Sequence, residues 1–389
     1  MKKISIVSLA IFIVSGIINA FPITQLLHVD IGIVSLAIPL VYVGVSIFKK
    51  NILNKSFYFI FPLISLILYS RHISIFYNQN KLVNILMLIL ISFIIAPFLL
   101  NDEKDLMLFF NSLVVLGLII ALYSLFAGDL NSNSRLEING SNPIWVSRAI
   151  SFAFLWMFLL FLHKKIGIKL FLICEIPILY SMFLTGAKGP ILALFGTIFL
   201  IQIRNIKLLL RNKKFLVTIY LICLMAIPLF FIIQSKDNVI LSRYTDFIKG
   251  NDTEYIRINI QRISIALIKT NPLGIGIGNF SYANLTYPHN IILESFLELG
   301  WIFGSYFTFL LLVCFIVLYK KSKNNLVLQG LFGFYSIALI NAMFSGNMVS
   351  PKEIYMAMPI ALVMLVQSMF KKREYHRVKS QYNNQSVNT

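Results

Sequence analysis

Charged residues are scarce in this chain. Only 13% of its 389 residues are Asp, Glu, Lys or Arg, whereas 58% are hydrophobic, and the mean hydropathy is +0.82. Soluble domains carry about a quarter charged residues, so the composition excludes an ordinary soluble fold. Acidic residues are especially few, with 15 Asp and Glu against 34 Lys and Arg.

Cysteine is rare, and acidic metal-binding clusters are missing from the outer loops. Cys174, Cys223 and Cys314 all fall inside apolar runs, without C-x-x-C or histidine spacing, which argues against a disulfide framework and a zinc site. No D-x-D cluster occurs in these loops, and we expect neither a metal nor a cofactor. Asp252 and Glu254 are the residues to suspect if a metal were found.

Long apolar runs are what the sequence has in abundance. Twelve of them approach the roughly 20 residues that a helix needs to cross a bilayer. They span residues 4–20, 31–48, 56–70, 82–100, 106–127, 144–162, 166–184, 189–203, 215–233, 290–319, 326–346 and 354–370. Three are short, so the count could change by one or two. The first run could pass for a signal peptide, but the later spans favour a retained helix.

The fold class follows from the chemistry of the bilayer. Lipid offers no partner to a backbone N–H or C=O, and the runs are too long and too uniformly apolar for the strands of a barrel. We therefore predict an all-α, polytopic transmembrane helical bundle of about 12 spans. One large extracytoplasmic loop, with an amphipathic helix, interrupts it.

Basic residues are distributed unevenly between the connections. With twelve spans and a cytoplasmic N-terminus, 22 of the 34 Lys and Arg lie on the cytoplasmic side, as the positive-inside rule expects. The net charge of +19 then reflects topology and attraction to membrane lipids. It does not indicate nucleic-acid binding, because the basic residues are interleaved with spans. The predicted units are N-terminal helices 1–233, a loop 234–289, C-terminal helices 290–370 and a disordered cytoplasmic tail 371–389.

Twelve basic residues remain on the outer side, where the insertion rule does not require them. We interpret five as solvated loop charges: Arg71, Lys81, Lys236, Lys249 and Lys352. Lys188 and Arg148 differ, since they lie close to apolar runs. A cation at membrane depth usually faces a polar cavity or an anionic partner.

The loop 234–289 contains a predicted helix from Glu254 to Lys269. Its apolar residues recur at helical spacing, with polar residues on a neighbouring face. The apolar residues are Ile256, Ile260, Ile263 and Leu267. The helix lies either at the membrane surface, with arginines facing headgroups, or over the mouth of the bundle.

A glycine-rich segment, NPLGIGIGNF at 271–280, follows this helix. Its alternate glycines permit close backbone approach or positive φ. They resemble a dinucleotide fingerprint only superficially, because no strand precedes them. We predict a tight re-entrant turn that borders a cavity.

A polar stripe begins the next apolar run. Asn290, Glu294 and Glu298 repeat every four residues, and His289 precedes them. Two carboxylates in this position need partners, and we expect the outer arginines to supply them. The stripe is then either a structural ion-pair network or part of a site.

These segments together resemble the O-antigen ligase and polymerase superfamily of bacterial envelope polysaccharide assembly. The resemblance rests on Arg257 in a loop helix, on N-P-L-G-x-G-x-G-N-F at 271–280, and on P-H-N-x-x-L-E-x-x-x-E-x-G at 288–300. T-G-A-K-G at 185–189 is similar to the family's threonine-glycine-serine-arginine-glycine turn. Lys188 replaces the usual arginine and loses its bidentate fork.

The resemblance implies a metal-independent glycosyltransferase in the bacterial inner membrane. It implies transfer of glycan from an undecaprenyl diphosphate carrier to an acceptor hydroxyl on the outer side. His289 is the expected base, and Glu294 is expected to orient it or to hold a sugar hydroxyl. Asn290 and Glu298 are expected to bind glycan. The expected diphosphate-binding residues are Arg257, Arg243, Lys188, Arg148 and Arg262, because cations stabilise the leaving group.

Within the superfamily, composition favours a polymerase that joins carrier-linked repeat units, since the chain is rich in Phe, Ile, Lys and Asn. The alternative is a ligase that transfers the glycan to lipid A core. A flippase or other transporter is a weaker alternative, because no repeat relates the halves and the polar residues do not cluster at the midplane. A chain-length regulator is a further candidate partner.

Overall fold

The structure is a computed structural model that describes residues 1–50, 79–130, 135–204, 253–280 and 287–385. Within these residues it is helical apart from one short hairpin, β1 (Asp129–Leu130) with β2 (Leu136–Glu137). The helices are α1 (Lys2–Ile18), α2 (Pro22–Leu26), α3 (Ile31–Lys50), α5 (Gln79–Leu99), α6 (Glu103–Ala127), α7 (Pro143–Leu162), α8 (Ile168–Leu184), α9 (Lys188–Ile203), α13 (Thr253–Thr270), α15 (Ile291–Lys321), α16 (Leu326–Ser345) and α17 (Lys352–Gln385).

The helical prediction is confirmed where the structure tests it. Ten of the twelve predicted apolar runs coincide with helices, while 56–70 and 215–233 lie outside the described residues. Among the described residues, five helices are long and apolar enough to cross a membrane. They lie at 81–99, 103–127, 143–162, 291–321 and 326–345. The count of about 12 spans stays a prediction.

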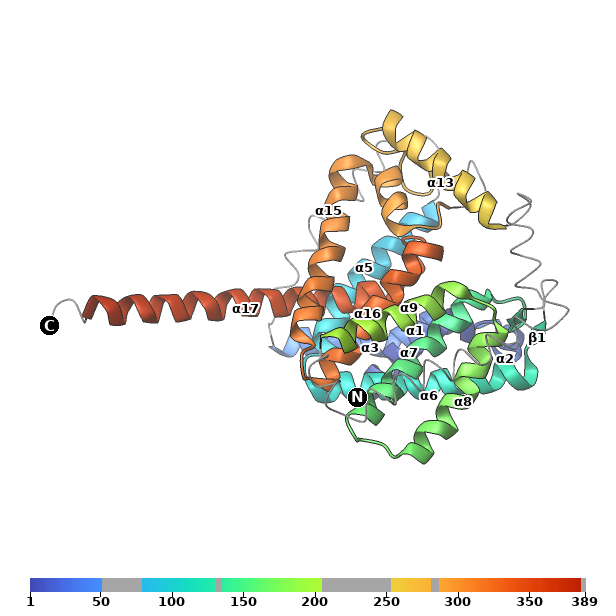
Figure 1. The fold of residues 1–389 in the computed structure, drawn as a ribbon, viewed down its shortest axis with the longest axis horizontal. Coiled ribbons are helices and arrows are strands. Elements are labelled where there is room, and N and C mark those ends of the chain that lie inside the picture. Colours follow the sequence, from blue (N-terminus) through green and yellow to red (C-terminus); the bar gives the residue numbers. More distant parts are fainter. Residues whose placement is uncertain (51–78, 131–134, 205–252, 281–286, 386–389) are drawn as a thin grey trace.

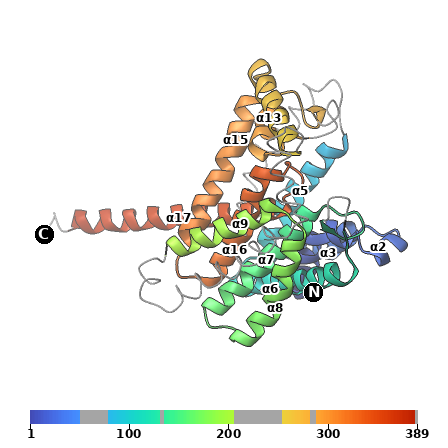
Figure 2. The same ribbon diagram turned by 45° about the vertical axis from the view of Figure 1, so that its right-hand side comes forward.

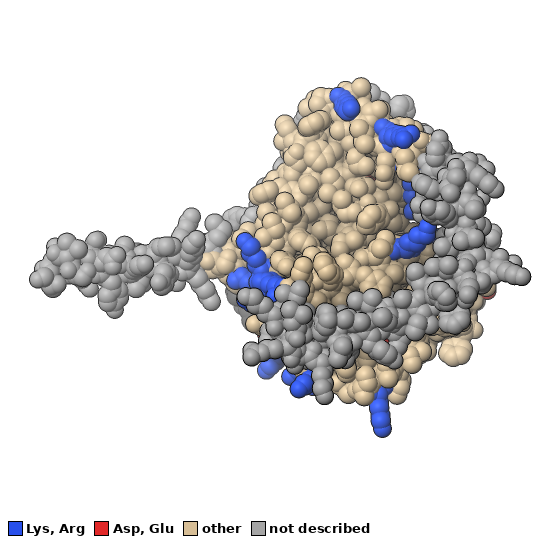
Figure 3. All heavy atoms as spheres, viewed as in Figure 1, with Lys and Arg blue, Asp and Glu red and all other residues tan. Residues whose placement is uncertain are grey.

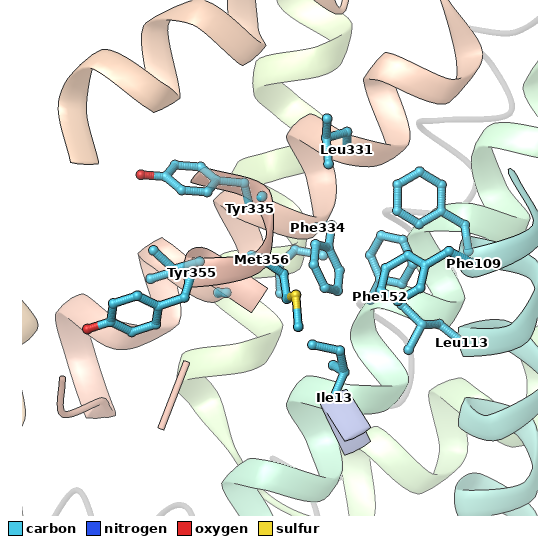
Figure 4. Packing of buried hydrophobic residues seen from close by; sticks show 14 of the residues in the cluster. Ile13, Phe109, Leu113, Phe152, Leu331, Phe334, Tyr335, Tyr355 and Met356 are labelled. Atoms are coloured by element: carbon cyan, nitrogen blue, oxygen red, sulfur yellow. The ribbon is translucent and has the colours of Figure 1, made fainter. Parts of the chain in front are cut away.

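Helices α7 and α16 form the centre of the bundle, and both are deeply buried. Aromatic rings fill their contact with each other and with α6: Phe152 of α7 and Phe334 of α16 lie 5.1 Å apart between ring centroids, and Phe109 of α6 is edge-on to Phe334 (Figure 4). A Cβ at Gly330 would lie 2.3 Å from the Trp156 ring, so this glycine lets α7 and α16 approach closely. Large rings opposite small residues fill a core without voids.

Polar contacts join the helix connections at each end of the bundle. At one end, which we call the basal end, the connections near residues 1–3, 101–105, 163–169 and 319–325 come together. Lys2 pairs with Asp105 at 2.5 Å, and Asn325 donates to Glu103 at 2.6 Å. These segments are the ones predicted to share the cytoplasmic side.

The opposite end, which we call the loop end, gathers the last turns of α1, α8 and α16 and the first turns of α5, α7, α9, α15 and α17. Long-range contacts show this directly: Lys81 pairs with Glu294, and Lys352 donates to the carbonyl of Phe12 at 2.9 Å. Segments predicted to lie on the outer side therefore meet in one place. The position of either end relative to a membrane stays a prediction.

Helix α15 is broken at Gly300, which corrects the prediction of one continuous span over 290–319. Gly300 has φ 77° and ψ −178°, outside the helical region. A Cβ at Gly304 would lie 2.7 Å from the Cα of Phe296, so the chain doubles back at this point. The polar stripe therefore belongs to a short separate helix at 291–299 and its N-cap, and only the part after Gly300 continues through the bundle.

The glycine-rich segment packs against this break. Ile275 and Gly276 donate their N–H groups to the carbonyls of Leu297 and Glu298, at 2.9 and 3.1 Å. Trp301 donates in return to the carbonyl of Pro272 at 2.8 Å. The loop thus satisfies backbone groups that the broken helix leaves unpaired.

Two glycines allow the loop and the break to touch. A Cβ at position 274 would lie 2.5 Å from the N of residue 300, and a Cβ at position 300 would lie 2.4 Å from the carbonyl carbon of Leu273. Gly274 and Gly300 both have positive φ, at 87° and 77°. The sequence predicted close backbone approach here, and the partner is the helix break.

The predicted loop helix is present as α13, which lies across the start of α15 (Figures 1 and 2). Its buried face includes Ser264 and Ile268, and it packs on Leu297 and Phe280. Ile260 and Leu267 of the predicted apolar stripe pack on this cluster, whereas Ile256 and Ile263 of the same stripe are 57% and 48% exposed. We call α13, the glycine-rich segment and residues 287–300 the cap. Figure 3 shows basic side chains on the surface over α13.

The C-terminal tail was predicted to be disordered from residue 371, and this is wrong for most of it. Helix α17 continues to Gln385 and projects away from the bundle (Figure 1). Lys, Arg, Glu and Gln, which are frequent here, are good helix formers. A polar segment that extends an apolar helix avoids the cost of starting a new one.

Candidate active site

His289 is held at the start of the short helix by an unusual backbone conformation. Its φ is 57°, in the left-handed region that non-glycine residues rarely adopt. The next residue, Asn290, caps the helix by accepting from the N–H groups of Ile292 and Leu293, both at 3.0 Å. Its amide also donates to the carbonyl of Met343 at 3.0 Å, which fixes the histidine against α16.

The imidazole of His289 lies against Tyr287, with 4.3 Å between ring centroids. Nδ1 is buried and has no hydrogen-bond partner within the described residues. Burial, together with the positive charge of Arg257, lowers the pKa of His289 to about 4. The ring is therefore neutral at neutral pH and able to accept a proton. Burial has the opposite effect on Tyr287, whose pKa it raises.

The two glutamates of the stripe are paired with Lys81. Its Nζ lies 2.5 Å from Glu294 Oε1 and 2.6 Å from Glu298 Oε1, and the carboxylates are fully buried. The interpretation of Lys81 as a solvated loop charge is wrong, because its side chain is only 9% exposed. The expected pairing with outer arginines is replaced by this lysine. A buried carboxylate without a partner would cost several kcal/mol, so the stripe needs it.

Further contacts hold the glutamates beneath the cap. Glu294 uses its second oxygen to accept from the N–H of Met348 at 2.7 Å, and no hydrogen bond joins its carboxylate to His289 among the described residues. Glu298 is buried beneath the cap, and the amide of Asn290 is used in capping. The geometry therefore gives no support to the roles predicted for Glu294 in orienting the base, or for Asn290 and Glu298 in binding glycan.

The predicted cations of the loop differ in their positions. Arg257 is half-buried on α13, and its charge helps to lower the pKa of His289 and partly opposes the rise that burial causes in the pKa of Tyr287. Arg262, one turn further along, is exposed. Arg243 lies outside the described residues.

A second cation-bearing turn joins α8 to α9. Gly186 has φ 59°, and the hydroxyl of Thr185 accepts from the N–H of Ala187 at 3.3 Å. Lys188 is the exposed first residue of α9, where the helix dipole also favours an anion. Arg135 Nε donates to the carbonyl of Thr185 at 2.8 Å. Arg135 is one of the twelve outer basic residues, and its place on this turn could not be found from spacing.

A comparison with known families identifies the segment that carries these features. Residues 170–308 match the family model described as O-antigen ligase. The match confirms the resemblance to the O-antigen ligase and polymerase superfamily. It supports a ligase or polymerase type of function on lipid-linked oligosaccharides. No curated protein matches the chain.

The O-antigen ligase segment includes His289, Arg257, Lys188 and both stripe glutamates, but it does not contain every group at the loop end. Lys81 on α5 and the N–H of Met348 come from outside it. The buried carboxylates of the segment therefore depend on parts of the chain that the family match does not cover.

Arg148 also lies outside the O-antigen ligase segment and has its own partners. Its Nε is 3.2 Å from Glu353 Oε1, and its guanidinium donates to the carbonyl of Ser350 at 2.9 Å. The ion pair offsets the charge that was predicted to bind diphosphate. Lys352, interpreted as a solvated loop charge, instead donates to Ser15 Oγ at 2.8 Å. That interpretation is wrong, because the lysine ties α17 to α1.

The structure offers no alternative metal centre in the part it describes. Within residues 1–50, 79–130, 135–204, 253–280 and 287–385, no three His, Cys, Asp or Glu are grouped closely enough to hold a metal ion. Asp252 lies outside these ranges. Metal-independent chemistry stays a prediction.

Proposed function

We propose that this chain is an oligosaccharide repeat-unit polymerase of the bacterial inner membrane. It transfers glycan from an undecaprenyl diphosphate carrier to a sugar hydroxyl on another carrier-linked repeat unit. The loop end then faces outward, where the lipid-linked substrates are delivered. The family match supports the reaction class, and the Phe-, Ile-, Lys- and Asn-rich composition favours the polymerase.

The proposed reaction is a direct displacement at the anomeric carbon. The acceptor oxygen forms a bond to that carbon while the bond to the carrier phosphate breaks. The electron pair leaves with the diphosphate, and the proton of the acceptor hydroxyl passes to the base. Two kinds of group are needed, a neutral base and cations at the leaving oxygen.

His289 is the proposed base, and its setting is the observation that carries the proposal. It is neutral, partly buried, in a strained conformation and under the influence of Arg257. Strained backbone persists at sites where the surroundings fix it for function. A histidine with a pKa of about 4 is a weak base, but a bound diphosphate offsets the charge of Arg257 and raises that pKa.

Arg257 and Lys188 are the proposed diphosphate ligands, with Arg243 as a third and Arg262 as an outlying fourth. Arg257 supplies a planar fork that matches phosphate oxygens. Lys188 supplies a point charge at a helix N-terminus. Arg135, bonded to the same turn, is a positioning residue for it.

Glu294, Glu298 and Lys81 are proposed to position the base. The triad joins α5 to the short helix that begins beside His289, and Glu294 extends this connection to the α16–α17 turn. It thus holds the cap on the bundle. This replaces the direct roles that the sequence predicted for the glutamates.

The second candidate function is a ligase that transfers the finished glycan to lipid A core. The description of the matching family favours it. Both reactions use the same base and the same leaving group, so they differ only in the acceptor. A chain-length regulator is a proposed partner of the polymerase alone.

Deletion and complementation separate the two functions. If the chain is a polymerase, a deletion strain carries single repeat units on core, and the wild-type gene restores a long ladder on a gel. If it is a ligase, the deletion leaves bare core while carrier-linked polymer accumulates. Restoration by His289→Ala at matched membrane levels would contradict the proposed base.

A further inference from the structure

A pocket of about 260 Å³ lies at the loop end beside the site. It is formed by the last turns of α1, the first turns of α7 and the connection between α16 and α17. Ile13, Ile17 and Trp145 provide an apolar wall, and the Trp145 side chain is 40% exposed. Gly16 faces this ring, and a Cβ built on it would lie 4.0 Å from Trp145 Cε3. The glycine thus leaves room in the pocket.

The other wall carries the ion pair between Arg148 and Glu353. Only one carboxylate oxygen of Glu353 takes part in it, and the side chain is 90% buried. The second oxygen, Oε2, has no hydrogen-bond partner among the described residues, and Glu353 lines the pocket. A buried acceptor without a donor loses its hydrogen bonds to water and gains none in return. A ligand that brings a donor would restore such a hydrogen bond.

The chemistry of the walls selects the class of ligand. Two cations also line the pocket, but both are bound by protein acceptors: Lys352 by the Phe12 carbonyl and Ser15 Oγ, and Arg148 by Glu353 and the Ser350 carbonyl. Glu353 Oε2 has no donor in the described part of the chain, and it can accept from a hydroxyl. The amide of Asn347 adds a polar group, and the indole of Trp145 offers an apolar face. A sugar ring combines these features, because it has hydroxyls around its edge and C–H groups on its faces. A lipid tail would leave the Glu353 oxygen unsatisfied.

The pocket shares a wall with the proposed active site. Asn347, Val349 and Ser350 line it, and the residue between them, Met348, donates to Glu294. The charge of Arg148 also acts on Tyr287, the ring beside His289, where it partly opposes the rise in pKa that burial causes. A glycan that reaches the base can therefore extend into this pocket.

We propose that this pocket binds one sugar ring of the glycan substrate, with a ring hydroxyl donating to Glu353 Oε2 and a ring face against Trp145. The inference rests on the proposed function, since it assigns part of that substrate. It also gives Arg148 a role other than diphosphate binding: it holds Glu353 in place.

The test measures binding apart from transfer. The probe is the free repeat-unit oligosaccharide, released from its carrier by mild acid and added to the full chain in detergent. Saturation-transfer difference NMR reports its affinity. Gly16→Leu fills the pocket from a position where the Cβ itself fits, and Trp145→Ala removes the stacking face. We expect each to weaken binding at least about tenfold, which corresponds to one well-made contact.

Two variants serve as controls. Gly44→Leu changes a helical glycine in α3 that has nothing within 4 Å of its Cβ position and does not line the pocket. His289→Ala removes the base. We expect Gly44→Leu to bind the oligosaccharide as the wild type does, and His289→Ala to abolish transfer, which identifies the transfer signal. Thermal unfolding of Gly16→Leu beside Gly44→Leu shows whether the fold is intact.

The outcomes separate the pocket from the function. If Gly16→Leu binds the oligosaccharide like the wild type, or if the wild type does not bind it, the pocket assignment is overturned. If the wild type binds the oligosaccharide but never transfers it from the carrier, the proposed function fails while the pocket stands. If transfer occurs and Gly16→Leu affects neither binding nor rate, only the pocket fails.

Discussion

The two ends of the bundle use charge differently. At the basal end, Lys2 and Asp105 pair with side chains that are 31% and 13% exposed. At the loop end, Lys81 meets two fully buried carboxylates. An exposed pair contributes at most about 1 kcal/mol, whereas removing one partner of a buried pair costs about 3–5 kcal/mol. The loop end thus buries charges at a cost in folding free energy, which is typical of a functional site.

The largest expected effect is on the rate of glycan transfer, when a histidine at one end of the bundle is replaced. His289→Ala should reduce glycan transfer by about 10²–10⁴-fold, because general base catalysis is worth that much. His163→Ala, which removes a histidine bonded to Gln329 at the basal end, should leave transfer near the wild-type rate. Initial rates with purified chain and carrier-linked oligosaccharide measure both. Equal losses of transfer rate in the two variants would contradict the assignment of catalysis to the loop end.

The second expected effect is on the free energy of unfolding, when the lysine of either ion pair is replaced. Lys81→Met leaves two buried carboxylates without a cation and should destabilise the chain by about 3–5 kcal/mol. Lys2→Met should cost no more than about 1 kcal/mol. Denaturant unfolding in detergent compares them. Combining Lys81→Met with Glu294→Gln and Glu298→Gln should recover much of the loss. Failure to recover would mean that packing by Lys81, and not charge, holds the cap.

A third effect tests the helix break. Gly300→Ala places a Cβ 2.4 Å from Leu273 at a positive φ, and the conformational strain alone costs about 1–3 kcal/mol. Gly44→Ala has open space in α3 and should stabilise its helix by up to about 1 kcal/mol. Thermal unfolding and transfer rates measure both. A Gly300→Ala variant as stable as the wild type would contradict the close contact between loop and break.

The smallest effect is a shift in pH dependence. Burial and Arg257 hold the pKa of His289 near 4, below its ordinary 6.5. The neutral base thus persists as pH falls below 6.5, and kcat/KM should decline only near pH 4. Arg257→Gln removes the positive charge, so this decline should move to higher pH. The unfolded chain binds the proton first, so the associated stability is present above pH 6.5 and is lost as pH falls toward 4.

The same pH series checks the assignment of the base. Because kcat/KM reports the free enzyme, substrate does not obscure the pKa of His289. An acid limb near pH 6.5 in the wild type would mean that the histidine is more exposed to water than the structure shows. An unchanged limb in Arg257→Gln would separate Arg257 from His289.

Much of this site could be predicted from local pattern. Apolar runs predicted the helices, helical spacing predicted α13, and the proline-histidine-asparagine motif pointed to His289. The glycines at 274 and 300 needed positive φ, and close approach was expected for the first. Local patterns did not show which segment the glycine-rich loop approaches. That segment is the backbone at the break in α15, to which the loop is hydrogen-bonded.

The sequence by itself determined an α-helical membrane chain with a segment that resembles the O-antigen ligase and polymerase superfamily, because hydropathy, periodicity and short motifs are local properties. Only the tertiary structure decided which charges meet. Lys81 and Glu294 are 213 residues apart, and Arg148 reaches Ser350 across 202. Such pairs depend on how the helices pack. A buried charge needs a partner because water no longer solvates it, but the sequence does not show where in the chain that partner lies.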